Sequence, residues 1–192
     1  MASRIIRVHK EKDHRHVTLT FRFVTVTQLF DDSDTRPLPE KEVTELAEET
    51  MSGYVDEFFL KEPMDLVIEL PDSELPPDTE ALIPDAVRRH FTLLIPGLDH
   101  DLQLVKRSGL ESAIIALVNA ILGIFFIYYF SKGGIVQTWY TIVIGFILII
   151  ANWASFWATY EIFFYDYRSL LLKRRNYRKI ISSPIRVRRY SQ

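Results

Sequence analysis

The chain of 192 residues contains no cysteine, which excludes disulfide bonds, thiolate zinc sites and cysteine nucleophiles. Glycine is scarce as well: the seven glycines are scattered, and none of them forms a Walker or dinucleotide-binding loop. A serine-histidine-aspartate signature is also missing. These absences predict a protein without enzymatic activity, bound cofactor or metal.

Charge is absent from two long apolar stretches, 113–130 and 139–160. As helices, the first (18 residues) would be about 27 Å long and the second (22 residues) about 33 Å long. Either length can cross a hydrocarbon core of about 30 Å. Eight residues, 131–138, join the two stretches. We therefore expect an integral membrane protein with two spans in a tight helical hairpin.

Positive charge flanks the two stretches unevenly. Lys106 and Arg107 precede the first stretch, nine basic residues follow the second, and the connector carries only Lys132. Because positive flanks are retained in the cytoplasm, both termini are expected there, in a multi-pass protein of the cell (inner) membrane. Residues 1–16 lack the apolar core of a signal peptide, so the first span is expected to direct insertion.

Three parts are expected on this basis: a cytoplasmic α+β domain (1–105), the transmembrane hairpin (106–165) and a basic cytoplasmic tail (166–192). The first and last differ strongly in charge. Residues 31–101 hold 20 acidic and 5 basic residues, whereas 168–189 hold nine basic residues and no acidic one. An acidic body and a basic tail in one compartment predict different partners.

Hydrophobic periodicity predicts a small ββαβα domain with its helices on one face of a sheet. The expected strands are 4–9, 17–27 and 64–70, with a hairpin connection at 10–15. A bulge near Phe23 and Val24 would keep one face of the second strand buried; the alternative is that both faces are covered at that end. The expected helices are 40–60 and 84–94, with a loop at 28–39. Pro96 and Gly97 should end the second helix before another begins and enters the first span.

Several short motifs share one resemblance. They are Gln28-Leu29-Phe30-Asp31 with Asp34 and Pro37-Leu38, Asp65-Leu66-Val67-Ile68, Arg89-His90-Phe91, and Trp153, Trp157, Glu161 and Tyr165-Asp166 before a run of Arg and Lys. Together they resemble a family of uncharacterised prokaryotic two-span membrane proteins with a small N-terminal cytoplasmic domain. The resemblance implies this architecture and no particular activity. The sequence departs from the family pattern at Ile95-Pro96-Gly97, where an unbroken helix rich in arginine is expected.

Small and polar residues within the spans are the first candidate site. Asn119 and Asn152 should lie at similar depth in antiparallel helices, which predicts a hydrogen bond between them. The small-residue stripes are Ala113, Ala116, Ala120 and Gly123 on the first span, and Gly145, Asn152, Ser155 and Thr159 on the second. We interpret them as contacts that hold helices or subunits together; an ion or substrate path is the alternative.

Trp153, Trp157 and Glu161 share one helix face because they follow each other at intervals of four. Glu161 lies at the inner boundary. A salt bridge to Lys106, Arg107 or an arginine of the tail is the preferred interpretation, and a proton or cation site in an oligomer is the alternative.

The basic tail is the second candidate site. Its membrane-proximal members are Arg168, Lys173, Arg174, Arg175, Arg178 and Lys179. Such clusters attract anionic lipid by about 1 kcal/mol per residue, although the same charges also serve simply to fix topology. Nucleic-acid binding is not expected.

Histidines offer weaker candidates. Asp99-His100-Asp101, with His14 and His16, could bind a metal or act as acid and base, but a solvated loop is preferred because metal-ligand spacing is missing. His90 is expected to be a packed side chain of its helix.

The leading hypothesis is a noncatalytic membrane protein that self-assembles, or docks a partner as a subunit of a membrane complex, through its acidic domain. The hairpin and the basic tail would anchor that domain. The alternative is a homo-oligomeric ion channel or transport subunit lined by Asn119, Asn152 and Glu161, and an enzyme using Asp99 and His100 is a distant third.

Overall fold

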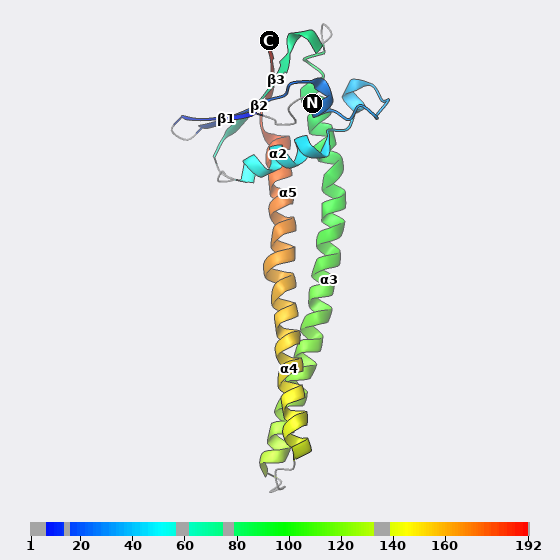
Figure 1. Ribbon diagram of the computed structural model, residues 1–192, viewed down its shortest axis with the longest axis vertical. Helices are drawn as coiled ribbons and strands as arrows, with labels where there is room; N and C mark the ends of the chain where they lie inside the picture. The colour runs from blue at the N-terminus through cyan, green and yellow to red at the C-terminus, as the bar shows by residue number, and fades with distance from the viewer. Residues whose placement is uncertain (1–6, 14–15, 57–61, 75–78, 133–138, 192) are drawn as a thin grey trace. The chain divides into compact units, whose positions relative to one another are not determined.

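The computed structural model describes residues 7–13, 16–56, 62–74, 79–132 and 139–191. The chain forms two compact units (Figure 1). One comprises Met1–Leu98 together with Leu172–Gln192, and the other comprises Asp99–Leu171. The class is α+β, as predicted, and two long apolar helices follow the N-terminal strands.

A four-stranded sheet in the order β1-β2-β3-β4 organises the first unit. The strands are β1 (Arg7–Asp13), β2 (His16–Arg22), β3 (Met64–Pro71) and β4 (Ile185–Tyr190). β1 pairs antiparallel with β2, whereas β3 is parallel to both β2 and β4. The fourth strand therefore comes from the far end of the chain, beyond both apolar helices.

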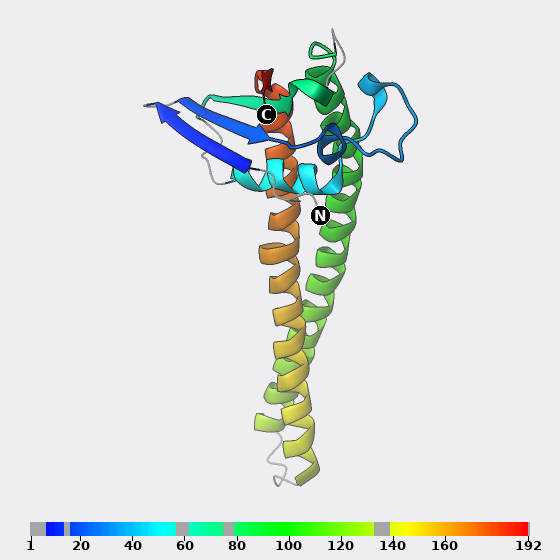
Figure 2. The same cartoon turned by 45° about the horizontal axis from the view of Figure 1, so that its top comes forward.

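One face of the sheet is apolar because of the expected alternation. Val17, Leu19 and Phe21 of β2 are fully buried, and Leu66 and Ile68 continue this face on β3. Helix α2 (Glu45–Asp56) lies along this side of the sheet (Figure 2), contributing the buried side chains of Ala47, Met51 and Val55. The start of α3 and the end of α5 contribute Ile83, Val87, Phe91, Tyr177 and Ile180 to the same core.

The expected bulge in the second strand is wrong. β2 ends at Arg22, and a short helix, α1 (Val26–Leu29), begins within the range predicted to be strand and ends in the predicted loop. The side-chain oxygen of Gln28 accepts the Val24 N–H at 2.8 Å, which favours this turn over a continued strand. Residues 28–39 also contain a 3₁₀ turn, η1 (Leu38–Glu40), and a second one, η2 (Asp72–Glu74), follows β3.

Helix α2 is shorter at its start than predicted. Thr44 limits it, because its hydroxyl oxygen accepts the Ala47 N–H at 3.2 Å, as a residue preceding a helix does. Val43 is held outside the helix by a bridge to Phe30. Residues 57–60 of the predicted helix, and 4–6 and 14–15 of the predicted first hairpin, lie outside the described residues.

The predicted helix break at Pro96 and Gly97 is wrong as well. Helix α3 runs without interruption from Ile83 to Lys132 and contains Pro96. A proline inside a helix removes one backbone hydrogen bond, at about 3 kcal/mol. Burial of Phe91 before Pro96 and of Leu98 after it favours the continuous helix.

The second apolar helix also continues further than predicted. α4 (Trp139–Glu161) passes into a π-helical turn, η3 (Ile162–Asp166), and then into α5 (Tyr167–Ser182). The predicted separate tail at 166–192 is therefore wrong for Leu172–Gln192, which belongs to the sheet domain. The residues at the end of α5 and in β4 are retained in this domain by burial of Tyr177, Ile180 and Ile185.

Candidate functional site

Two side-chain hydrogen bonds join the apolar helices α3 and α4. Asn119 Nδ2 donates to Ser155 Oγ at 2.7 Å, while the Ser155 hydroxyl donates to the Ala151 carbonyl. About two turns back along α3 and one turn further along α4, Ser112 Oγ and Thr159 Oγ1 lie 3.1 Å apart. Because the Thr159 hydroxyl donates to the Ser155 carbonyl, Ser112 is the donor of this second bond. The helices are thus held by polar contacts between small side chains.

The predicted hydrogen bond between Asn119 and Asn152 is not formed. Asn119 instead uses Ser155, one turn further along α4. Within the described residues the Asn152 amide makes no side-chain hydrogen bond. It lines an apolar hollow of about 240 Å³ together with Ala120, Gly123, Gly145 and Ile149. A polar amide is therefore left without a partner at the middle of an apolar surface.

Gly109 lies opposite the π-helical turn. A Cβ atom at Gly109 would lie 2.8 Å from Cζ of Phe163 and 3.0 Å from Cγ2 of Ile162. No side chain fits there without movement, so glycine permits the close approach of α3 to η3. π-helical turns insert a residue into a helix and often occur at functional sites. The sequence shows a glycine at position 109. Its contact with Ile162 and Phe163 could not be predicted, because it depends on the π-helical turn η3.

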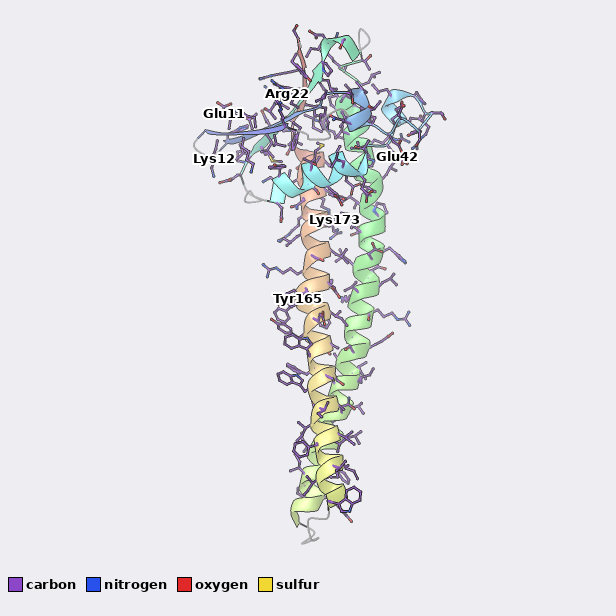
Figure 3. The ribbon with its side chains drawn as sticks, in the orientation of Figure 1. Glu11, Lys12, Arg22, Glu42, Tyr165 and Lys173 are labelled. Carbon is purple, nitrogen blue, oxygen red and sulfur yellow. The ribbon has the colours of Figure 1, made fainter. Side chains whose placement is uncertain are left out.

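Aromatic rings continue along α4 and η3. Trp153 and Trp157 stack with their ring centres 6.4 Å apart, and Tyr160 stacks on Phe164 at 4.4 Å. Trp153 is 69% exposed, and Tyr165 projects from the helix beside this column (Figure 3). The predicted shared face of Trp153 and Trp157 is thus visible as an aromatic ridge.

Glu161 ends α4 with an exposed side chain. Among the described residues, no ion pair joins it to Lys106 or Arg107. Arg107 instead binds Glu111 on its own helix, with Nε and Oε1 3.0 Å apart. The salt bridge expected for Glu161 with these two residues is therefore wrong.

A polar cluster around Glu48 links three helices of the sheet domain. Glu48 on α2 accepts a hydrogen bond from the Tyr177 hydroxyl of α5. Its carboxylate also lies 3.4 Å from His90 Nε2 of α3 and 3.5 Å from Lys173 Nζ. Lys173, labelled on α5 in Figure 3, also lies 5.5 Å from the centre of the Tyr177 ring. We call Glu48, His90, Lys173 and Tyr177 the glutamate clamp.

Both ring nitrogens of His90 have partners in the clamp. His90 Nδ1 accepts the Val43 N–H at 3.2 Å, and His90 Nε2 lies 3.4 Å from the Glu48 carboxylate, so the Nε2–H tautomer fits both contacts. The His90 side chain is only 9% exposed, in agreement with the predicted packed histidine. Burial and the hydrogen bond to Glu48 raise the pKa of Tyr177, which therefore remains a donor.

The six basic residues predicted to bind lipid have different surroundings. Arg168, Arg175 and Arg178 are exposed, whereas Lys173 belongs to the glutamate clamp. Arg174 is half-buried and Lys179 is 8% exposed. Burial lowers the pKa of Lys179, although nearby Glu62 acts in the opposite direction. A uniform lipid-facing cluster is therefore wrong for Lys179.

Sequence reasoning overlooked Glu48 and Tyr177. Tyr177, Ile180 and Ile181 are spaced as an apolar helix face, and this spacing could have revealed the buried side of α5. Glu48 gave no signal of its own, because many acidic residues surround it in the sequence.

A second carboxylate, Asp34, shapes the loop before α2. Asp34 accepts hydrogen bonds from Arg36 Nε at 2.9 Å and from the Glu42 N–H at 2.9 Å. The Arg36 guanidinium and these bonds hold the pKa of Asp34 well below its usual range. Arg36 Nη2 lies 2.7 Å from Glu42 Oε1. This arrangement closes a loop and has no feature of a reactive site.

The described histidine candidates, His16 and His100, do not form a metal site. Asp99, His100 and Asp101 lie within helix α3, so the expected loop is wrong there. His16 instead pairs with Asp65 at 3.5 Å, and His14 lies outside the described residues. Across the described part of the chain, no group of three potential ligand side chains comes together.

Comparison with known protein families, with curated proteins and with solved structures finds no match to this chain. The resemblance to two-span prokaryotic membrane proteins therefore remains a prediction from the sequence motifs.

Proposed function

We propose that this chain is a noncatalytic integral membrane protein whose two apolar helices form a two-span hairpin. Both helices are long and apolar enough to cross a membrane. Their large side chains, such as Ile124 at 67% exposure and Trp153 at 69%, are uncovered within the structure. Surrounding these side chains with lipid would remove the free-energy cost of contact with water.

The sheet supports a topology with both flanks on one side of the membrane. β3 precedes the two apolar helices in sequence and β4 follows them, yet the two strands pair directly. A sheet cannot form across a bilayer, so the chain must return to the side from which it entered. Two crossings satisfy this condition, and the basic flanks support a cytoplasmic location for that side.

Self-assembly is the function that these features support best, and the observation that carries it is the unpartnered Asn152 amide. In hydrocarbon, a hydrogen bond to a polar group of another helix lowers the free energy of an unpaired asparagine. Small residues let helices approach closely enough to form it. Asn152 and the adjacent Gly123 and Gly145 supply both conditions. Exposed acidic side chains of the domain, including Glu45 and Glu49, offer a second surface to a neighbouring copy or another subunit.

Size measurement in nanodiscs and in detergent tests this proposal. The wild type should be larger than a monomer, and Asn152→Leu should shift it toward the monomer. Asn119→Leu is the matched control, because the Asn119 amide is already bound within the chain to Ser155.

A wild-type protein that stays monomeric and brings no partner through purification would contradict the proposal. Ion flux through vesicles containing an intact oligomer would instead favour the channel alternative.

A further inference from the structure

The sheet face opposite the core carries a row of charged residues, one from each strand. The pairing places Arg7 of β1 opposite Arg22 of β2, Arg22 beside Glu69 of β3, and Glu69 beside Arg188 of β4. Neighbouring strands lie about 4.8 Å apart, so these four side chains form one line across the sheet. We call this line the arginine row.

Arg22, near the centre of the row, is held from two sides. Its Nε lies 2.6 Å from Glu69 Oε2, and its guanidinium carbon lies 4.8 Å from the centre of the Tyr190 ring. The Tyr190 hydroxyl in turn donates to the Phe23 carbonyl at 3.0 Å, which fixes the ring. The guanidinium is therefore positioned before any ligand arrives.

The row holds more positive than negative charge. It contains three arginines against one glutamate, and Glu69 is already engaged by Arg22. Within the described part of the chain, Arg7 and Arg188 take part in no ion pair. Like charges directly opposite each other, as in Arg7 and Arg22, are unfavourable without a counter-charge. An anion placed here would relieve that repulsion.

The row borders an open hollow of about 400 Å³, which also includes His9, Thr20 and Glu11. This volume falls in the range of small-molecule sites. Glu11 is four residues from Arg7 along β1, or about 13 Å, so its carboxylate lies toward the other end (Figure 3). The hollow thus has a cationic end and an end that can accept hydrogen bonds.

We propose that this hollow binds a phosphate monoester whose remaining part carries hydroxyl groups. The guanidinium fork matches phosphate oxygens in pairs, and the excess charge of the row complements a phosphate that carries nearly two negative charges. Thr20 can donate to the phosphate, and Glu11 can accept from a ligand hydroxyl. The ligand is either a soluble phosphorylated polyol or the headgroup of a phosphorylated inositol lipid. This site does not depend on Asn152 or on self-assembly.

Calorimetric titration of the full-length protein in phosphatidylcholine nanodiscs with inositol 1-phosphate tests the soluble source. Saturable binding is expected, and Arg188→Gln and Arg7→Gln should each weaken it about tenfold. Arg89→Gln is the matched control, since it removes an exposed arginine of α3 outside the row and should alter affinity less than twofold. Circular dichroism verifies that each variant remains folded.

Nanodiscs that contain phosphatidylinositol 4-phosphate test the lipid source. A rise in the unfolding temperature of the wild type that Arg188→Gln abolishes and Arg89→Gln retains would assign the ligand to the membrane. Failure of both ligands to bind would overturn the proposal. A loss in Arg89→Gln equal to that in Arg188→Gln would do the same, because it would reflect general attraction between charges.

Discussion

The sheet domain and the helical hairpin use the same residue types under opposite conditions. Ile68 in the domain is fully buried, whereas Ile124 in the hairpin is 67% exposed. Polar groups differ in the same way: Glu48 has three side-chain partners, but Asn152 has none within the described residues. The side chains of the sheet domain find their apolar and polar partners within the chain. The hairpin exposes apolar side chains and a polar amide that can make contacts with its surroundings.

This contrast separates two kinds of stability. The domain should resist unfolding through contacts within the chain, most of all at the glutamate clamp. If the two apolar helices cross a membrane as proposed, the hairpin should depend on lipid and on neighbouring helices, because helix contacts in a bilayer rely on close packing and hydrogen bonds. Four substitutions with matched controls can break or sharpen this contrast.

Tyr177→Ala should have the largest effect. The side chain is 1% exposed and contacts Phe91 edge to face, with the ring centres 5.0 Å apart. Its removal should lower the free energy of unfolding by about 3–5 kcal/mol, since large aromatic truncations in cores have this effect. Tyr177→Phe, which loses only the bond to Glu48, should lower it by about 1–2 kcal/mol. Urea unfolding followed by limited proteolysis measures both, and equal losses would contradict the packing role.

Glu48→Gln should destabilise the domain by about 1–3 kcal/mol, because it removes the negative charge that Lys173 and Tyr177 approach. Glu49→Gln changes an exposed neighbour and should alter the unfolding free energy by less than about 0.5 kcal/mol. Urea unfolding measures both variants. Equal losses of unfolding free energy would show that Glu48 stabilises the domain no more than an exposed glutamate does.

Gly109→Ala should disturb the hairpin by about 1–3 kcal/mol, as overpacking commonly does. The added Cβ would lie 2.8 Å from the Phe163 ring. Gly97→Ala is the control in the same helix: no atom lies within 4 Å of its added Cβ, and alanine there should be neutral or stabilising by up to about 1 kcal/mol. Helix loss during detergent titration, followed by circular dichroism, measures both. Adding Phe163→Ala should restore the stability lost in Gly109→Ala. If it does not, the close contact between positions 109 and 163 is not the cause of the loss.

Acidification should reveal a smaller effect at Asp34. Its pKa is lowered in the folded protein relative to 3.8, so its contribution is present above about pH 4 and is lost as the pH falls toward the folded value. Asp34→Ala should therefore reduce the unfolding temperature by a few degrees at pH 7 and less at pH 3. Asp32→Ala, an exposed neighbour, is the control. An equal reduction at both pH values would exclude this ionisation as the cause.

Strong periodic signals in the sequence predicted part of the fold. The uncharged stretches located the two apolar helices, and the alternation from Val17 to Phe21 identified the buried strand face. Pro96 led to the wrong prediction of a helix break. Burial of Phe91 before it and of Leu98 after it outweighs the helix-breaking effect of the proline. β4 was missed because a strand with arginine at three of its six positions resembles a solvated tail until β3 is available to pair with it.

For the candidate site, too, the sequence predicted only part of the contacts. Similar depth in the two helices predicted a polar contact for Asn119, but depth alone could not distinguish Asn152 from Ser155, which is one helical turn away. The arginine row and the glutamate clamp both need long-range pairing of distant segments. Neither pairing leaves a local pattern in the sequence.

The side of the membrane reached by each segment is the most direct test of the account. Because the chain has no cysteine, single cysteines introduced at Glu45, Gln137 and Ser191 report cleanly with a thiol reagent that cannot cross membranes. In intact cells the reagent should label position 137 only, and positions 45 and 191 should react together after lysis. Labelling of 45 and 191 from opposite sides, or of 137 from the same side as both, would contradict a hairpin that returns the chain to its own sheet.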